Sequence, residues 1–199
     1  MFVVSSYYVQ ICYRLFLLIS YVHFIIIIRS DFLSYVALTK ALLPSWEQQI
    51  SQGKGKPIII NTSSVAGKIG PPVRTAYAGS KHAIMGWFNA FRIEQILAGF
   101  PIQVLNIVLG STRTDVARNA VAESKDAKCK TVDSNIEQGL EVDFVVERVV
   151  AAAYAGHEEI WLAQKKELLV LYLNQYVPEV ANRLFMKSMA KQYAVQNEN

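Results

Sequence analysis

The chain has 199 residues, of which 52% are hydrophobic and 18% charged, and its formal net charge is +4. This length and composition suffice for one ordered domain with a sizeable core. The basic residues are scattered, so the sequence predicts no nucleic-acid partner. Cys12 and Cys129 lie too far apart for a metal-binding spacing, and no metal site is predicted.

Residues 1–30 form a hydrophobic N-terminal segment in which Arg14 is the only charged residue before Arg29. A bilayer span needs about 20 apolar residues, so the segment is long enough to be a membrane anchor. Arg14 in its middle is unfavourable for a span. Two interpretations stay open: a membrane anchor, which predicts membrane association, or an artefact of the chain start, which predicts a cytoplasmic protein.

A helix is predicted over 32–50, after this segment. Ser30 and Asp31 are residue types that cap helix N-termini, and they are expected to start it. Pro44 lies inside the range and is expected to kink or end the first part of the helix. The folded domain is therefore expected to span residues 31–199.

The central stretch of the chain joins a strand predicted over 57–62 to a helix predicted over 75–98. Tyr77 and Lys81 are four residues apart, so the helix places both side chains on one face. Ser64 follows the strand, at the carboxyl end where open α/β sheets bind ligands. The three side chains are therefore expected to lie close together.

These three residue types are suited to proton transfer at a substrate oxygen. A free tyrosine has a pKa of about 10, and an ammonium such as that of Lys81 lowers this pKa by stabilising the phenolate. Tyr77 then acts as an acid or base near neutral pH, while the Ser64 hydroxyl holds the same oxygen. Such a relay is half of a redox reaction, and the other half requires a hydride carrier that side chains do not supply.

Two further strands are predicted over 102–108 and 159–163, and an amphipathic helix over 143–155. The strand over 102–108 is nearly all apolar, which is typical of a parallel strand buried on both faces. Because strands and helices alternate, the sequence predicts an α/β fold. We expect a Rossmann-like parallel sheet with flanking helices and right-handed crossovers.

The central stretch resembles the active-site segment of the short-chain dehydrogenase/reductase family. The resemblance rests on Asn-Thr-Ser-Ser-x-x-Gly after the strand and on Tyr-x-x-x-Lys, with Tyr77 thirteen residues after Ser64. It implies an NAD(P)-dependent oxidoreductase in which Ser64, Tyr77 and Lys81 are catalytic. Tyr77 and Lys81 would also contact the cofactor, for which NADP is slightly favoured over NAD.

Three further positions match this family less fully. Gly110 and Thr114 fit its Pro-Gly-x-x-x-Thr loop and are therefore implied contacts to the nicotinamide end of the cofactor, although Leu109 replaces the proline. Asp31 stands where the family carries a catalytic asparagine, and a carboxylate cannot donate as an amide does. That difference puts a water-bridged proton relay in question.

The family's glycine-rich phosphate loop has no counterpart in these 199 residues, because neither Gly-x-x-x-Gly-x-Gly nor Gly-x-Gly-x-x-Gly occurs. Such loops hold the cofactor pyrophosphate at a helix N-terminus. Residues 31–199 are therefore expected to be the C-terminal part of a family member, truncated on the N-terminal side. Such a chain is expected to bind the cofactor weakly and to turn over little.

The resemblance also implies partners. The segment from Lys165 onward is similar to that of the member 7 group and of related membrane-associated hydroxysteroid and retinoid reductases. It implies a small lipophilic carbonyl or alcohol substrate and a location at a membrane such as the endoplasmic reticulum. In the family, the region 115–140 is a substrate lid.

The apolar face of the helix over 75–98 is expected to be either a homodimer contact or ordinary core, and its residues are Met85, Trp87, Phe88, Phe91 and Ile93.

Two alternatives from other classes of protein stay open. The chain is either an enzyme or a catalytically impaired fragment or pseudoenzyme that acts as a binding partner. The second alternative is a serine hydrolase built on Ser64 and His82. The absence of a Gly-x-Ser-x-Gly elbow around Ser64 makes the hydrolase the weaker of the two.

Overall fold

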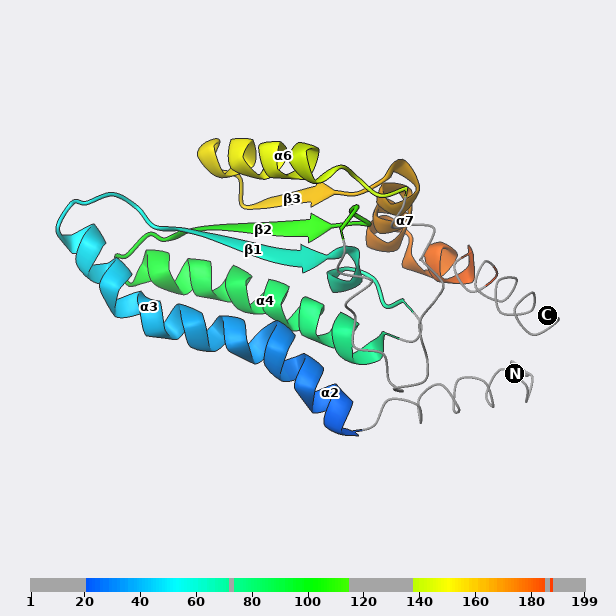
Figure 1. Ribbon diagram of the computed structural model, residues 1–199, viewed down its shortest axis with the longest axis horizontal. Helices are drawn as coiled ribbons and strands as arrows, with labels where there is room; N and C mark the ends of the chain where they lie inside the picture. The colour runs from blue at the N-terminus through cyan, green and yellow to red at the C-terminus, as the bar shows by residue number, and fades with distance from the viewer. Residues whose placement is uncertain (1–20, 72–73, 115–137, 185–186, 188–199) are drawn as a thin grey trace.

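The computed structural model describes residues 21–71, 74–114, 138–184 and 187. A parallel sheet forms the middle layer, as Figure 1 shows. Helix α4 (Thr75–Leu97) lies on one side of this sheet and α6 (Val142–Tyr154) on the other. A long helical segment that ends at Ser51 runs alongside α4 and forms an outer layer. The predicted α/β fold with flanking helices is therefore confirmed.

The sheet contains three strands, β1 (Ile58–Ser64), β2 (Gln103–Leu109) and β3 (Glu159–Leu162), in that order. Both strand pairs are parallel, and the register places Ser64 opposite Leu109. The three predicted strands are thus confirmed in one parallel sheet. Because the strands run in the same direction, the residues that follow them gather at one end of the sheet, the edge formed by the carboxyl ends of the strands (Figure 1).

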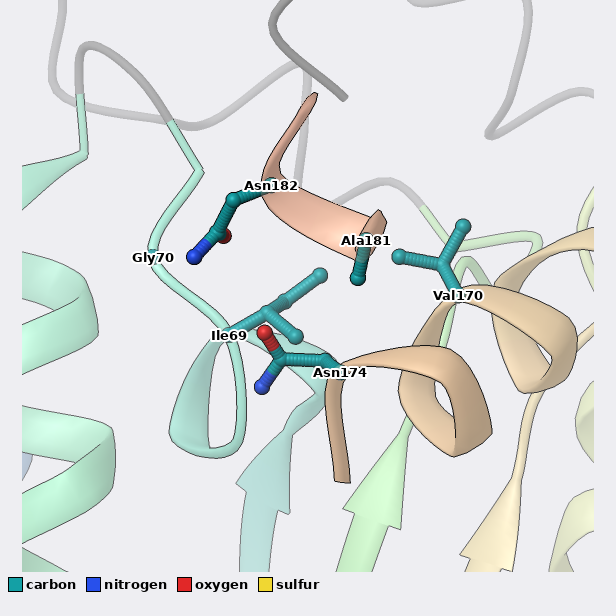
Figure 2. Close-up of a pocket in the computed structure, with 6 residues that line it drawn as sticks. All are labelled: Ile69, Gly70, Val170, Asn174, Ala181 and Asn182. Atoms are coloured by element: carbon teal, nitrogen blue, oxygen red, sulfur yellow. The ribbon is translucent and has the colours of Figure 1, made fainter. Parts of the chain in front are cut away.

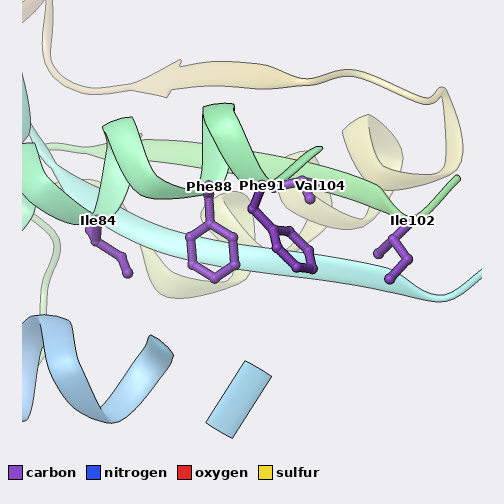
Figure 3. Close-up of a cluster of buried hydrophobic side chains, with 5 residues drawn as sticks. All are labelled: Ile84, Phe88, Phe91, Ile102 and Val104. Atoms are coloured by element: carbon purple, nitrogen blue, oxygen red, sulfur yellow. The ribbon is translucent and has the colours of Figure 1, made fainter. Parts of the chain in front are cut away.

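The main core lies between α4, the sheet and the long helical segment. Figure 3 shows Ile84, Phe88 and Phe91 projecting from α4, with Ile102 just before β2 and Val104 within it. Burying such large side chains contributes most of the free energy that holds the two layers together. Partly buried side chains pack around this cluster, namely Phe32, Tyr35, Val36, Leu43, Trp46, Ile50, Ile59 and Trp87.

This packing bears on the predicted homodimer face of α4. Met85, Phe88 and Phe91 are at most 5% exposed, so these three side chains are ordinary core within one chain. Trp87 stacks on Phe91 with ring centroids 5.1 Å apart. Ile93 is 55% exposed and is the member of the set that remains available to a partner.

The first described helix differs from the prediction. Helix α2 (Tyr21–Ile28), a π-helical turn (Arg29–Leu33) and α3 (Ser34–Ser51) follow one another directly, so Ser30 and Asp31 lie inside a helical segment and do not cap one. Ser30 Oγ donates to Asp31 Oδ1 at 2.7 Å. The prediction of a cap is wrong because the apolar residues before Arg29 continue the helix and pack along α4.

The helical segment from Tyr21 to Ser51 is long and apolar enough to cross a membrane by length and composition alone. A buried core helix or a signal sequence passes the same test, and this segment packs against α4 through Phe32 and Trp46 among others. Pro44 lies inside α3, so of the two predicted effects it does not end the helix. Residues 1–20 of the predicted hydrophobic segment lie outside the described part of the chain.

The two outer strands of the sheet, β1 and β3, differ in how much of their side-chain surface is covered. Helix α6 packs on β2 and β3, where Leu105 and Ile107 are buried against Ala152 and Ala153. The outer strand β1 presents Ile58 and Ile60 on its uncovered face, and these side chains are 46% and 45% exposed. An apolar strand at an edge with one uncovered face is a surface suited to a further partner.

The C-terminal segment begins with α7 (Lys165–Tyr176), whose N-terminus carries a capping box formed by Gln164 and Glu167. Leu171 is 1% exposed and packs with Met85 and Val108. Tyr176, in contrast, is 75% exposed. The helix therefore closes the core at the edge of the sheet where the strands end.

Candidate active site

Lys81 is the central charge of the candidate site. Its ammonium nitrogen Nζ lies 5.6 Å from the ring centroid of Tyr77, one turn earlier on α4, and donates to the carbonyl oxygen of Thr62 at 3.2 Å. The residue is 8% exposed. A cation over an aromatic ring is stabilised by the ring quadrupole, more so where water is excluded. The predicted pairing of Tyr77 and Lys81 on one helix face is present.

Two effects shift the pKa of Lys81 in opposite directions. Burial lowers the pKa of Lys81 from its ordinary value of 10.5, because removal of water destabilises the charged form. The negative charge of Asp31, from the π-helical turn, acts in the opposite direction and raises this pKa. The candidate site therefore contains a partly desolvated ammonium with a carboxylate near it.

Ser64 ends β1 and begins a 3-10 turn (Val65–Gly67). Its side-chain oxygen accepts a hydrogen bond from the backbone N–H of Ala66 at 3.2 Å. The preceding Ser63, on the buried face of β1, donates from Oγ to the carbonyl oxygen of Lys81 at 3.2 Å. The contact of Ser63 with Lys81 therefore fixes this part of β1, including Ser64, next to α4.

Gly67 allows the 3-10 turn to approach α4 closely. A Cβ at this position would lie 2.5 Å from Ser63 Oγ and 2.9 Å from the Lys81 carbonyl oxygen. Gly67→Ala is expected to lower the free energy of unfolding by about 1–3 kcal/mol, because the backbone of α4 must yield. Gly86→Ala is the control, since its Cβ meets no atom within 4 Å and alanine favours the helix by up to about 1 kcal/mol. Urea unfolding measures both variants, and equal stabilities would contradict the close approach.

The loop after β2 places Gly110, one of the other two predicted contact residues, beside the end of β1. Gly110 directly follows Leu109, which pairs with Ser64, and a Cβ there would lie 2.3 Å from Glu167 Oε2. Glu167 Oε1 accepts from the backbone N–H of Ser111 at 3.1 Å and from its hydroxyl at 2.8 Å. Thr114 is exposed at the end of the described segment. The predicted lid begins beyond it, and residues 115–137 lie outside the described part.

Two residues of this region were not predicted from the sequence. The ring centroid of Tyr35, on α3, lies 5.6 Å from Lys81 Nζ. Glu167 contacts Ser111 from 56 residues away, and nothing local in the sequence indicates that contact.

The arrangement does not favour the hydrolase alternative. A ring nitrogen of His82 lies 2.9 Å from the carbonyl oxygen of Ala78 on its own helix, and Ser64 Oγ is engaged with Ala66. A serine nucleophile requires a base within hydrogen-bond reach.

Within the described ranges, no group of three His, Cys, Asp or Glu side chains is placed to hold a metal ion.

Comparison with protein families decides the assignment that the site suggests. The family model described as short chain dehydrogenase matches residues 16–125. The chain belongs to the short chain dehydrogenase family. The match begins inside the apolar N-terminal segment, earlier than residue 31, where the resemblance seen in the sequence was placed.

Curated relatives of the chain belong to the group named dehydrogenase/reductase SDR family member 7 and its 7B and 7-like forms. The human protein of that name is 33% identical over 155 residues, which cover 76% of this chain and 43% of the relative. Member 7B of Xenopus tropicalis is 32% identical over 165 residues, and the Drosophila melanogaster member 7-like protein is 33% identical over 169 residues. The matches cover 50% and 48% of these two relatives, so the chain spans about half the length of the curated relatives it matches.

Solved structures of short chain dehydrogenases share the fold. A Burkholderia cenocepacia enzyme in complex with NADP has a TM-score of 0.60 at 16% identity, covering 79% of this chain and 56% of that one. A Streptomyces avermitilis enzyme has a TM-score of 0.60 at 18% identity, covering 90% and 66%. A 4-hydroxyisoleucine dehydrogenase mutant complexed with NADH and succinate has a TM-score of 0.55 at 23% identity, covering 74% and 61%.

Burial of Lys81 affects how the stability of the folded chain depends on pH. Since burial lowers the pKa of Lys81 in the folded chain, the unfolded chain binds more protons between that lowered pKa and 10.5. The free energy of unfolding is therefore expected to rise with pH through this window. Lys81→Met is expected to remove the rise, whereas Lys40→Met, at an exposed position of α3, should retain it. Urea unfolding at several pH values from neutral to 10.5 measures the slope, and an unchanged slope in Lys81→Met would contradict this assignment.

Proposed function

We propose that the chain carries the proton-transfer site of a nicotinamide-dependent oxidoreductase that acts on a carbonyl or alcohol. The observation that carries this proposal is the Lys81 ammonium 5.6 Å from the Tyr77 ring, at the edge of the sheet where β1 ends in Ser64. Ligands of open parallel sheets bind at this edge. The family assignment supports the same reaction class.

Each side chain of the trio has a distinct part in the proposed reaction. The Tyr77 hydroxyl gives a proton to the substrate oxygen during reduction and takes one during oxidation. The Lys81 ammonium stabilises the Tyr77 phenolate, because a positive charge nearby favours the ionised phenol. The Ser64 hydroxyl donates to the substrate oxygen and fixes its position. A nicotinamide cofactor, when bound, supplies or accepts the hydride.

The proposed cofactor contacts are Tyr77, Lys81, Gly110 and Thr114. Two observations support them: β1 and β2 end side by side, and Lys81 offers a buried ammonium as a donor to ribose hydroxyls. The solved structures with the same fold were obtained with NADP and with NADH. We propose NAD(P) as the cofactor, with NADP slightly favoured.

The proposed substrate is a small lipophilic carbonyl or alcohol of the steroid or retinoid kind. Figure 2 shows a hollow beside the end of β1, where the 3-10 turn meets the C-terminal segment. Apolar and amide side chains line it: Ile69, Gly70, Val170, Asn174, Ala181 and Asn182. Its lining is about equally polar and apolar and carries no charged residue, and its volume of about 30 Å³ is far below the size of a steroid or retinoid. The proposed substrate class therefore rests on the family resemblance alone.

The test is turnover by the purified chain. NADPH or NADH is supplied with a retinoid aldehyde, a steroid ketone or a small polar ketone, and oxidation of the cofactor is followed by absorbance. We expect slow turnover with a lipophilic carbonyl and less with the polar ketone. Turnover with none of these carbonyls at saturating cofactor would overturn the proposal.

Cofactor affinity is expected to be low in the 199-residue chain. The four proposed contacts reach only the nicotinamide end, and the sequence has no glycine-rich phosphate loop. Losing about 4 kcal/mol of polar anchoring weakens binding about a thousandfold. Quenching of the three tryptophans on titration with NADPH measures this affinity. A dissociation constant in the low micromolar range would contradict the expectation.

A second candidate function is a non-catalytic binding partner of a longer relative. The exposed apolar face of β1, with Ile58 46% exposed and Ile60 45% exposed, favours it. The open surface of α4 around Ile93 is proposed for a homodimer contact. The hydrophobic N-terminal segment, residues 1–30, is proposed as a membrane anchor, which would place the protein at a membrane such as the endoplasmic reticulum. Absence of turnover together with stable association in size-exclusion chromatography would favour this second function.

A further inference from the structure

Glu167, in the first turn of α7, connects the C-terminal helix to the loop after β2. Its Oε1 accepts hydrogen bonds from the backbone N–H and the hydroxyl of Ser111, at 3.1 Å and 2.8 Å. Its Oε2 accepts from the backbone N–H of Gln164 at 2.9 Å and thereby completes the capping box of α7. One half-buried carboxylate therefore holds together two elements that lie 56 residues apart in the sequence.

The loop comes unusually close to the start of α7 at Gly110. A Cβ there would lie 2.3 Å from Glu167 Oε2 and 2.7 Å from the Cβ of Ala163. The backbone N–H of Gly110 donates to the carbonyl oxygen of Leu162 at 2.8 Å. Only a residue without a side chain fits this approach, so the loop backbone lies directly against the residues that cap α7.

A second contact holds the other side of the loop. The backbone N–H of Leu140 donates to the carbonyl oxygen of Ser111 at 2.8 Å, and the N–H of Arg113 donates to the carbonyl oxygen of Leu140 at 3.0 Å. The Arg113 side chain also forms an ion pair with Glu141. Residues 110–113 are therefore fixed from two directions, and Glu167 supplies the side that faces α7.

The chemistry of a carboxylate suits this role. Its two oxygens both accept hydrogen bonds, so one can serve the loop while the other serves the helix. Hydrogen bonds to an ionised acceptor are also roughly twice as strong as those between neutral groups. Helix α7 lies at the end of the sheet where the strands finish (Figure 1), which is the end that carries the candidate site.

We propose that Glu167 is a positioning residue for the cofactor, which it does not touch itself. It fixes the loop through Ser111 and thereby holds Gly110 in place. The inference rests on the proposed function, in which Gly110 contacts the nicotinamide end of the cofactor. A loop that is fixed before the ligand arrives loses less conformational entropy on binding, so affinity is higher. Removal of the Glu167 carboxylate is therefore expected to weaken cofactor binding.

The experiment has two measurements on the nitrogen-15-labelled chain. Hydrogen exchange of the Ser111 amide, without cofactor, reports how firmly the loop is held. Chemical-shift titration with NADPH gives the dissociation constant, and it is suited to weak binding. Glu167→Ala removes both connections of the carboxylate, and alanine favours the helix. Ser111→Ala removes one of the two hydrogen bonds to the loop and leaves the cap of α7 intact.

Two control variants separate positioning from charge and from stability. Glu179→Ala removes an exposed carboxylate of the same C-terminal segment, so it changes the net charge as Glu167→Ala does. Leu171→Val shortens a side chain of α7 that is 1% exposed and packs with Met85 and Val108. It is expected to lower the urea midpoint without changing the loop after β2.

We expect Glu167→Ala to speed exchange of the Ser111 amide at least about tenfold and to weaken NADPH binding about fivefold. Ser111→Ala should give a smaller change in the same direction. Glu179→Ala and Leu171→Val should leave the dissociation constant within about twofold of the unmodified chain. Should Glu167→Ala not fold, the comparison of Ser111→Ala with the two controls decides the matter.

Three results would overturn the inference: unchanged exchange of the Ser111 amide, faster exchange with unchanged NADPH affinity, or an equal loss of affinity in Leu171→Val. Failure of the proposed function leaves a different record. If the unmodified chain binds no NADPH at millimolar concentration, the cofactor site is absent and the inference falls with it. If the expected differences in affinity occur without turnover, the role of Glu167 stands and the proposed reaction does not.

Discussion

Tyr77→Phe is expected to lower kcat/KM for carbonyl reduction at least about a hundredfold, because it removes the proposed proton donor. The substitution keeps the aromatic ring over which the Lys81 ammonium lies at 5.6 Å. Folding should therefore be little changed, and the loss should appear in turnover alone. Initial rates at saturating NADPH, with a lipophilic ketone as the varied substrate, measure it.

The matched control is Tyr154→Phe, which removes the same hydroxyl from a residue that is 94% exposed at the end of α6. It is expected to leave both rate and stability unchanged. An equal loss in the two variants would show that the effect at Tyr77 is general. An unchanged rate in Tyr77→Phe would end the assignment of proton transfer to this residue.

The largest expected effect on stability is at the centre of the core. Phe88 is 1% exposed, and its ring lies edge-on to Trp87 at 4.9 Å between centroids. Phe88→Ala is expected to lower the free energy of unfolding by about 3–5 kcal/mol, since it removes buried apolar surface and leaves a cavity. Ile93→Ala, on the same helix at a residue that is 55% exposed, should cost below about 1 kcal/mol.

Urea unfolding of both variants measures the difference between them. A similar loss of stability in Phe88→Ala and Ile93→Ala would contradict the placement of the core between α4 and the long helical segment. A large loss in Ile93→Ala alone would indicate that the exposed surface of α4 is covered in solution. That outcome would support the proposed homodimer.

The sheet and α4 were predictable because their signals are local. Continuous apolar runs marked β1, β2 and β3, and the parallel order followed from the helices between them. The end of α4 was marked by Gly99, whose φ of 84° is in the region that glycine adopts most readily. The spacing of Tyr77 and Lys81 was sufficient to place both on one face of that helix.

The helical segment before β1 was predicted less well, because local signals there disagree with the packing. Arg29, Ser30 and Asp31 interrupt an apolar run and look like a helix start, yet the chain stays helical through them. The π-helical turn absorbs the interruption while apolar side chains on both sides keep their contact with α4. Tertiary packing outweighs the capping preference at this position.

Contacts between distant parts of the chain were also not predictable. The ring of Tyr35 lies near Lys81 because the helical segment runs along α4. Glu167 reaches Ser111 only because α7 closes the edge of the sheet. No periodicity or motif in a single sequence records such pairings, since they depend on how whole elements pack.

The central claim is that Tyr77, Lys81 and Ser64 serve a hydride-transfer reaction. The most direct measurement uses NADPH carrying deuterium at carbon 4 of the nicotinamide, a lipophilic ketone and mass spectrometry of the alcohol formed. We predict that the unmodified chain produces alcohol with deuterium on the carbinol carbon and that Tyr77→Phe does not under matched conditions. Alcohol without the label, or labelled alcohol formed equally fast by Tyr77→Phe, would contradict the claim.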